Sequence, residues 1–243
     1  RGDPAPVSPV PTLGEVMESI SSLLADYGAD IPLAFWTNIR LAFLATLGSF
    51  VLGVVLALFR ISPVPSLRAI GTAYVNVVRN TPLTIVMLLG VLAVWGQLKI
   101  SFSSDFTLNF FIYAVIALSL YHAAFMCEAI RSGVNTVPLG QAEAARSLGL
   151  RPGITLRLVI IPQALRVIIP PLTSQYLNLA KNSSLAAGIG YPDMVSLFAG
   201  TVLNQTGQAI EVIAITMSVY LAISISISLL MNWYNKRIAL IER

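Results

Sequence analysis

Long apolar runs, separated by short polar intervals, dominate the pattern of this chain. Three runs, 41–59, 80–98 and 106–127, hold no Asp, Glu, Lys or Arg, and two more apolar segments follow at 167–180 and 210–234. A helix over the first run would be about 28 Å long, close to the ~30 Å hydrocarbon core of a bilayer. The pattern therefore predicts an all-α fold, an integral membrane bundle of five transmembrane helices.

The polar intervals divide the chain into a short N-terminal segment, 1–31, and one transmembrane domain, 32–243. In the N-terminal segment a proline-rich polar start precedes apolar residues at helical spacing, namely Val16, Ile20, Leu23 and Leu24. This spacing fits either a short amphipathic helix on the membrane surface or a tail with little helix. The longest hydrophilic interval of the transmembrane domain covers about 132–162.

Composition agrees with a membrane location. Of the 243 residues, 56% are hydrophobic and only 11% are charged, against about 25% charged residues in an average soluble domain. Mean hydropathy is +0.79. So few charges cannot cover a soluble fold, so we expect the chain to sit in the lipid bilayer. A single cysteine, Cys127, and a single histidine, His122, exclude a disulfide framework and a Cys/His zinc site.

The positions of lysine and arginine predict the orientation of the helices. If the loops after the first, third and fifth spans share one side, that side carries most of the basic residues: Arg60, Arg68, Arg79, Arg131, Arg146, Arg151, Arg157, Arg166, Lys236, Arg237 and Arg243. The positive-inside rule then places the N-terminus outside and the C-terminus in the cytoplasm. Basic cytoplasmic loops, and no nucleic acid, explain the net charge of +4.

Polar residues inside the spans are the candidates for function, because they are costly in lipid. In the fourth span they form one stripe: Ser174, Asn178 and Lys181 follow i, i+4, i+7, and Gln175 and Asn182 flank them. The stripe should face the bundle or a water-filled path. The alternatives are interhelical hydrogen bonding for the amides and hydroxyls, and snorkelling to the membrane surface for Lys181.

Two other spans carry candidates of this kind. In the second span Asn80 and Thr81 stand beside Pro82, which cannot continue the helical hydrogen bonds and is expected to kink the helix. At the end of the third span Glu128 and Arg131 lie three residues apart. In one interpretation they form a local ion pair near the membrane face. In the other, Glu128 is close enough to a transport path to meet the ammonium group of a substrate or to act as a gate.

The hydrophilic interval contains a short predicted helix that ends near Gly149. Its small residues allow close approach to another surface, although a solvated loop helix has the same pattern. The interval resembles the EAA loop of bacterial ABC importer permeases, whose pattern is E-A-A, three residues, G, nine residues and I-x-L-P. Here the matching residues are Glu143-Ala144-Ala145, then Gly149 after three residues, then Val159-Ile160-Ile161-Pro162 after nine more. Val159 and Ile161 depart from it conservatively. The resemblance implies a coupling helix that contacts an ATP-binding subunit through Gly140, Glu143, Ala144, Ala145, Gly149 and Pro162.

Two further segments resemble permeases of the polar amino acid family. Arg79-Asn80-Thr81-Pro82-Leu83 is similar to R-x-T-P-L, and Lys181-Asn182-Ser183-Ser184-Leu185 is similar to K-(N/D)-(S/T)-S-L. The likeness covers about 32–243. Its first part is most similar to actinobacterial glutamate permeases, and 162–243 is more similar to permeases of general L-amino acid importers. Glutamate or glutamine and a broad range of L-amino acids therefore both stand as substrates.

The resemblance implies the fold of a type I ABC importer permease with a cytoplasmic coupling helix, in a bacterial plasma membrane. Its partners would be an ATP-binding cassette ATPase dimer, a second permease that is identical or similar, and an extracytoplasmic amino acid binding protein. The chain has no G-x-x-x-x-G-K-[ST] phosphate loop, so ATP and Mg²⁺ belong to the ATPase. No enzyme activity, catalytic residue, metal or cofactor is expected in this chain. Polar residues expected along the substrate path are Asn80, Thr81, Glu128, Ser174, Gln175, Asn178, Lys181 and Asn182.

Two other classes of protein fit the pattern less well. An ion-coupled secondary transporter usually shows an internal repeat with paired broken helices, and no such repeat is visible. An intramembrane enzyme would need a catalytic constellation, but the spans hold no paired carboxylates and no HExxH motif.

Overall fold

The computed structural model describes residues 12–238, and between them the chain is helical without strands. Four helical segments are long and apolar enough to cross a membrane: Leu13–Ile61, Phe106–Asn135, Pro152–Ile189 and Ala209–Tyr234. A strongly bent pair, Pro65–Arg79 with Leu83–Gln97, makes a fifth crossing if it is counted as one span. The predicted all-α membrane bundle is confirmed, and the number five holds with the bent pair counted in this way.

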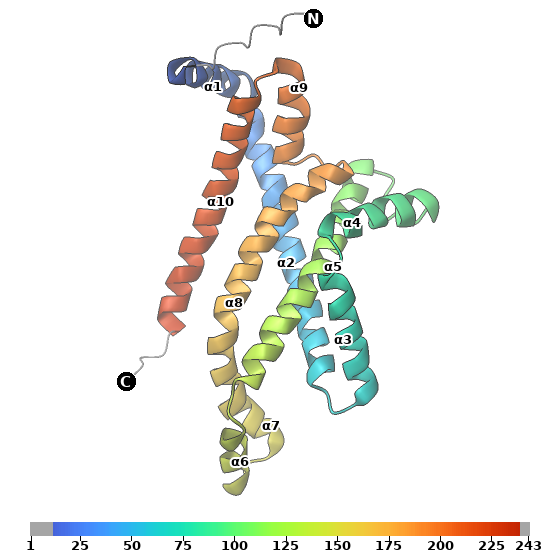
Figure 1. Ribbon diagram of the computed structural model, residues 1–243, viewed down its shortest axis with the longest axis vertical. Coiled ribbons are helices and arrows are strands. Elements are labelled where there is room, and N and C mark those ends of the chain that lie inside the picture. Colours follow the sequence, from blue (N-terminus) through green and yellow to red (C-terminus); the bar gives the residue numbers. More distant parts are fainter. Residues whose placement is uncertain (1–11, 239–243) are drawn as a thin grey trace, which may run out of the picture.

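The N-terminal segment contains helix α1 (Leu13–Tyr27), so this range is helical and is not a tail with little helix. Its place on the membrane surface stays a prediction. Thr12 and Glu15 form a capping box that satisfies the free N–H groups at the start of the helix. One face of α1, with Leu23 buried, packs on the last helix, α10 (Ala209–Ile238), and α1 lies across one end of the bundle in Figure 1. A short 3-10 turn, η1 (Gly28–Asp30), leads from α1 to the first long helix.

Helices α2 (Ile31–Ile61) and α5 (Phe106–Asn135) form the centre of the bundle. They touch closely because small residues lie at their contact. A Cβ atom added to Gly53 would lie 2.8 Å from Cβ of Met126 and 3.2 Å from the carbonyl oxygen of Ala123. Such close backbone approach is typical of helix pairs in membranes. These two helices therefore provide the fixed frame for the others.

The second predicted span is broken. Helix α3 (Pro65–Arg79) ends at a corner of 103°, beyond which α4 (Leu83–Leu88) and the π-helix η2 (Leu89–Gln97) run sideways out of the bundle (Figure 1). The break falls where Pro82 was expected to kink the helix, but the span begins earlier than the charge-free run 80–98, because the polar interval before that run is largely helix. Pro82 is the physical reason for the break, because it cannot donate to the α3 ladder and instead begins α4.

The hydrophilic interval forms a compact projection below the bundle in Figure 1. It consists of α6 (Leu139–Ser147), α7 (Pro152–Thr155) and the π-helix η3 (Leu156–Ile160). We refer to residues 139–160 as the knob. From there α8 (Ile161–Asn182) returns through the bundle beside α5, and is longer than the predicted apolar segment 167–180.

The chain closes the fold at the end where α1 lies. After α8 come the 3-10 helix η4 (Ser183–Ile189), the π-helix η5 (Ser196–Val202) and α9 (Leu203–Thr206), and then α10 runs back toward the knob side (Figure 1). α10 packs on α8, η5 and α1. It is therefore an outer helix of the bundle, and its exposed face carries large apolar side chains, including Met217, Leu221, Ile225 and Leu229.

Candidate functional site: a polar pocket and its surroundings

A polar pocket of about 270 Å³ lies between α5 and α8. Its walls are Tyr121, His122 and Phe125 from α5 and Gln175, Asn178, Lys181 and Asn182 from α8. Half of the eight predicted path residues, namely Gln175, Asn178, Lys181 and Asn182, are thus brought together. They meet because their spacing places them on one helix face, and that face is turned toward α5.

The α5 wall of the pocket contains residues that the sequence did not indicate as candidates. His122 is buried, and its Nε2 lies 3.2 Å from Nδ2 of Asn182, which joins the two walls. This contact gives one ring nitrogen of the buried His122 a hydrogen-bonding partner. Tyr121 and Phe125 add aromatic faces at i and i+4. In the sequence, only their i, i+4 spacing beside a lone histidine could have indicated a pocket wall. Aromatic residues of an ordinary helix core show the same spacing.

The other four predicted path residues lie outside the pocket lining. Ser174 is exposed on α8. Asn80 and Thr81 form the corner after α3, where the Asn80 Nδ2 donates to the carbonyl oxygen of Asn76 (2.7 Å) and the Thr81 hydroxyl donates to that of Val77 (2.8 Å). These bonds satisfy carbonyl groups that the broken helix leaves free, which is essential at membrane depth.

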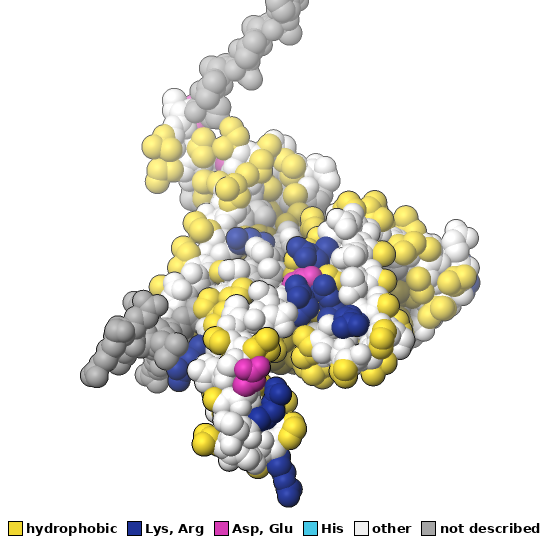
Figure 2. All heavy atoms as spheres, turned by 60° about the horizontal axis from the view of Figure 1, so that its bottom comes forward, with side chains coloured by type: hydrophobic (Ala, Val, Ile, Leu, Met, Phe, Trp, Pro, Cys, Tyr) yellow, Lys and Arg dark blue, Asp and Glu magenta, His cyan; other side chains and the backbone are white. Residues whose placement is uncertain are grey.

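Glu128, the fourth of these residues, is the centre of an ion cluster. Its carboxylate pairs with Arg60 of α2, with Arg79 of α3 (Nη1 to Oε1, 3.6 Å) and with Arg131 of α5 (Nη2 to Oε2, 3.0 Å). Three positive charges against one negative charge leave a net charge of +2. Figure 2 shows basic side chains gathered around an acidic one on the face from which the knob projects. The carboxylate is thus engaged by arginine from three helices.

The ion cluster and the polar pocket share a side chain. The guanidinium carbon of Arg79 lies 5.3 Å from the centroid of the Phe125 ring, within the range of a cation–π contact. Phe125 also lines the pocket. The Phe125 side chain therefore contacts Arg79 of the ion cluster and also forms part of the pocket wall.

A second buried polar network joins four elements at the α1 end of the bundle. Nδ2 of Asn38 lies 2.8 Å from the Tyr220 hydroxyl, 3.3 Å from Oδ2 of Asp193 and 3.4 Å from the Ser183 hydroxyl. Burial raises the pKa of Asp193 to about 6, and hydrogen bonds from Ser196 N–H, Asn38 and Tyr220 only partly oppose this effect. None of these residues was a sequence candidate, because they are far apart along the chain.

The knob places the motif residues of the hydrophilic interval on its surface. Glu143, Ala144 and Gly140 are exposed on α6, whereas Ala145 is buried beneath them. Gly149 has φ of +77°, a left-handed conformation that ends the helix, with its N–H donating to the Arg146 carbonyl (2.9 Å). Pro162, the last motif residue, is exposed in the first turn of α8.

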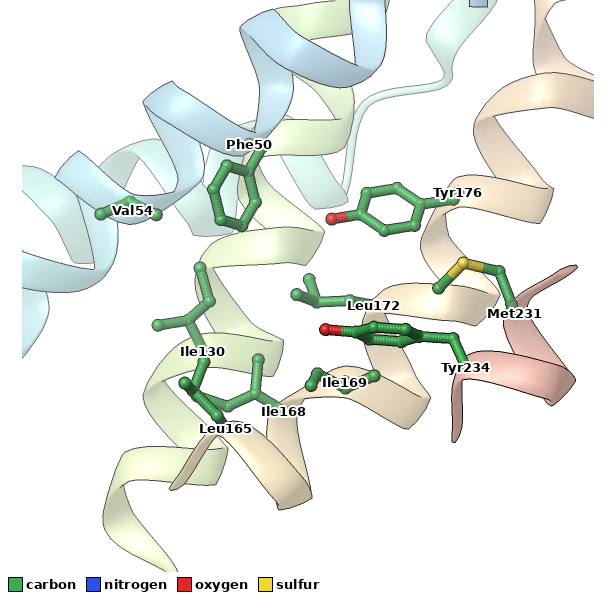
Figure 3. A pocket seen from close by; sticks show the side chains of 10 residues that line it. All are labelled: Phe50, Val54, Ile130, Leu165, Ile168, Ile169, Leu172, Tyr176, Met231 and Tyr234. Carbon is green, nitrogen blue, oxygen red and sulfur yellow. The ribbon is translucent and has the colours of Figure 1, made fainter. Parts of the chain in front are cut away.

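A third feature is an apolar cavity of about 350 Å³ between α10 and the rest of the bundle. Figure 3 shows Phe50 from α2, Leu172 and Tyr176 from α8, and Met231 and Tyr234 from α10 around it. None of its ten lining residues is charged, so the cavity offers no ionic partner to a zwitterion. Within residues 12–238 no group of three or more His, Cys, Asp or Glu side chains is placed to hold a metal ion.

Comparison with known proteins gives one family. Residues 49–240 match the family described as "Binding-protein-dependent transport system inner membrane component". The "Putative amino-acid ABC transporter permease protein YhdX" of Escherichia coli is 77% identical over 128 residues, which are 53% of this chain and 33% of YhdX. The chain thus spans about a third of this relative. The "Glutamate transport system permease protein GluC" of Corynebacterium glutamicum is 39% identical over 225 residues, covering 90% of this chain and 99% of GluC.

Partial and structural matches agree with these. The "General L-amino acid transport system permease protein AapQ" of Rhizobium johnstonii is 58% identical over 133 residues, 55% of this chain and 33% of AapQ. A chain of a solved structure, "Crystal structure of an amino acid ABC transporter with histidines", superposes with a TM-score of 0.76 at 28% identity and covers 94% of this chain and 99% of its own. A chain of the MetNI methionine ABC transporter has the same fold, with a TM-score of 0.68 at 19% identity and coverage of 86% and 96%.

Proposed function

The chain belongs to the family of binding-protein-dependent transport system inner membrane components, and on this premise we propose that it is a permease subunit of an ATP-driven importer of polar amino acids. The names of its relatives, which include glutamate and general L-amino acid permeases, support this substrate class. The observation that carries the proposal is the knob. It projects beyond the membrane-spanning helices and presents Glu143, Ala144 and Gly149 on its surface, as a helix that docks on a separate ATPase would require.

The polar pocket is the proposed part of the substrate path that recognises an amino acid. Lys181 supplies a positive charge for the α-carboxylate, and the amides of Gln175, Asn178 and Asn182 supply donors and acceptors. No carboxylate lines the pocket, and Glu128 is held by three arginines. The substrate ammonium group is instead expected to meet amide oxygens and the aromatic face of Tyr121.

The proposed partners are those that the missing phosphate loop and the position of the knob suggest: the chain has no G-x-x-x-x-G-K-[ST] motif, and the knob projects at one end of the bundle. ATP with Mg²⁺ is hydrolysed by a separate dimeric ATPase. Its closure pushes on the knob at Gly140, Glu143, Ala144, Ala145 and Gly149, and on Pro162 in the first turn of α8. A second permease, identical or similar, completes the path, and an external binding protein delivers the amino acid. In this arrangement α1 is outside the cell and the knob is in the cytoplasm. Transport is then a two-state change of the bundle that nucleotide biases.

A pull-down from native membranes tests this function. The tagged chain is solubilised gently, and co-purifying chains are identified by mass spectrometry for wild type, Gly149→Asp and Gly14→Asp. Gly149→Asp forces a charged side chain into a left-handed position in the knob and is expected to abolish recovery of the ATPase. Gly14→Asp is the matched control, because it adds the same charge in open space on α1.

The two outcomes separate the proposal from its alternative. Recovery of an ATP-binding subunit with wild type and Gly14→Asp, but not with Gly149→Asp, supports both the importer and the role of the knob. A second permease in the same eluate decides between a homodimer and a heterodimer. If wild type recovers no ATPase under conditions that preserve other membrane complexes, the proposed function is wrong, and uptake driven by an ion gradient becomes the next test.

A further inference from the structure

Arg79 occupies an unusual position. It is the last residue of α3 and stands directly before the corner of 103° that breaks this span. The bent pair that contains Arg79 counts as a membrane crossing when it is taken as one span, and a charged side chain within a span is costly unless it is paired or functional. In α3 the other arginine, Arg68, is exposed and has no ion pair among the described residues, so the pairing of Arg79 is specific to its place at the corner.

The three arginines around Glu128 are not equally held. Arg60 is hydrogen-bonded to the carboxylate, and its side chain is only 12% exposed. Arg131 donates from Nε at 3.1 Å and also pairs at 3.0 Å through Nη2. Arg79 is 3.6 Å away, makes no hydrogen bond to a residue that the structure describes, and is 46% exposed. Its contact with Glu128 is therefore the easiest of the three to break, and the carboxylate would keep two partners.

Phe125 lies between Arg79 and the polar pocket. Along α5, Tyr121, His122 and Phe125 line the pocket, and Glu128 follows one turn later in the direction of the knob. Along α8, which comes from the knob, Gln175 is the first of the four lining residues. Phe125 and Gln175 therefore mark the end of the pocket that is nearer to the knob. The Arg79 guanidinium covers one face of the Phe125 ring there.

We propose that Phe125 is a gate at the knob-side end of the polar pocket, and that Arg79 is the latch that holds it closed. A change at the corner after α3 withdraws Arg79 from Glu128 and from the ring, while Arg60 and Arg131 keep Glu128 in place. The Phe125 side chain is then free to rotate, and the pocket opens toward the cytoplasm. The inference rests on the proposed substrate path, but it concerns access to the pocket and can be measured without transport.

Thiol accessibility tests the gate in the whole transporter. The lone native cysteine, which is buried, is replaced in the background Cys127→Ala, and Gln175→Cys places a thiol in the pocket. Everted membrane vesicles without nucleotide receive a membrane-impermeant maleimide. A separate Leu148→Cys variant, at an exposed site on the knob, confirms which side of the vesicle is labelled.

Arg79→Gln and Phe125→Ala should each speed labelling of the pocket thiol by about tenfold, because they remove a cation–π contact or the ring itself. Arg79→Lys keeps a positive charge that can also lie over the Phe125 ring, and its labelling rate should stay within about threefold of the parent. Arg68→Gln is the matched control, since it removes the same charge from an unpaired site of α3, and it should change nothing.

Three results would overturn the proposal. A parent rate as fast as that of Phe125→Ala means that the pocket is not closed at this end. A rise with Phe125→Ala but not with Arg79→Gln removes the latch, and an equal rise with Arg68→Gln shows a general effect of charge. If Arg79→Gln fails to assemble, Phe125→Ala and Arg79→Lys still decide the matter. Failure of the wild-type protein, with Gln175 intact, to take up polar amino acids would instead count against the proposed function.

Discussion

Asp193 illustrates how much depends on single buried residues in this chain. It is 1% exposed, and it connects α2, α10 and η5 by accepting hydrogen bonds from Asn38, Tyr220 and the N–H of Ser196. A buried carboxylate is easier to keep neutral than charged, because burial penalises the charged form. Its protonation is therefore linked to the folding of the whole α1 end of the bundle.

The stability of the protein should fall as pH rises through this titration. The pKa of Asp193 is raised from its ordinary 3.8 to about 6, so the folded state binds a proton that the unfolded state releases. The stabilising contribution is complete below about pH 4 and is lost as pH rises through about 6. Thermal unfolding of the purified protein should show a fall of a few degrees over this window. Asp193→Asn should abolish the fall, and the exposed Asp26→Asn should keep it.

Lys181 is the residue whose loss should affect transport most selectively. Lys181→Ala removes the only positive charge of the pocket lining and is expected to lower uptake of amino acids about tenfold or more. Assembly should persist, because no described ion pair involves Lys181. Uptake into vesicles and gel filtration of the complex provide the two readouts. Lys99→Ala, at an exposed site outside the pocket, is the control, and equal losses in both variants would remove Lys181 from the path.

Glu128 should behave differently from Lys181. Glu128→Gln leaves three arginines without their shared anion, so we expect a loss of stability of about 1–3 kcal/mol together with reduced transport. A loss of both stability and transport indicates that Glu128 holds the ion cluster together. A loss of transport alone, with normal thermal stability of Glu128→Gln, would indicate a contact of the carboxylate with substrate.

At the scale of elements, the contact between α2 and α5 determines whether the bundle forms. Gly53 leaves no room for a side chain against Met126 and the backbone of α5. Gly53→Val should therefore separate the helices and lower the yield of folded protein, with a loss of about 2–4 kcal/mol. Gly14→Ala, which adds a methyl group in open space on α1, should not destabilise. Fluorescence-detected gel filtration after heating measures both.

Hydropathy located the centres of the membrane helices but not their ends or their bends. The charge-free run 41–59 lies inside α2, which begins ten residues earlier and includes Arg40 and Arg60. Lipid and headgroups accept such residues near helix ends, so charge does not mark where a helix stops. The corner after α3 was visible only as Pro82, since a proline predicts a break but not its angle.

For the candidate site, the sequence predicts which residues share a helix face, but not which helices pack together. Periodicity within α8 predicted that Gln175, Asn178, Lys181 and Asn182 share a face, and the pocket confirms that they meet. It could not identify α5 as the facing wall, because pairing of helices is a tertiary property. The Glu128–Arg131 pair follows from i, i+3 spacing, whereas Arg60 is 68 residues away in sequence and could not be assigned.

For the whole molecule, the orientation in the membrane is the first property to measure. Met17→Cys on α1 and Leu148→Cys on the knob are both exposed and lie at opposite ends of the bundle. With the Cys127→Ala background, an impermeant maleimide should label Met17→Cys only in intact cells and Leu148→Cys only in everted vesicles. The reverse pattern would place the knob outside and exclude its contact with a cytoplasmic ATPase.

The long helices are longer than the hydrocarbon core of a bilayer is thick, so their tilt should depend on bilayer thickness. α2 has 31 residues and α5 and α10 have 30 each, which at ~1.5 Å per residue is about 45 Å against a ~30 Å hydrocarbon core. Helices of this length cross at a tilt or extend beyond the hydrocarbon, and lipids with longer acyl chains would favour more upright helices. Because α5 leads directly into the knob, a change of tilt moves the knob relative to whatever docks on it. On these lengths, we expect lipid composition to act on this protein through the angle of its helices.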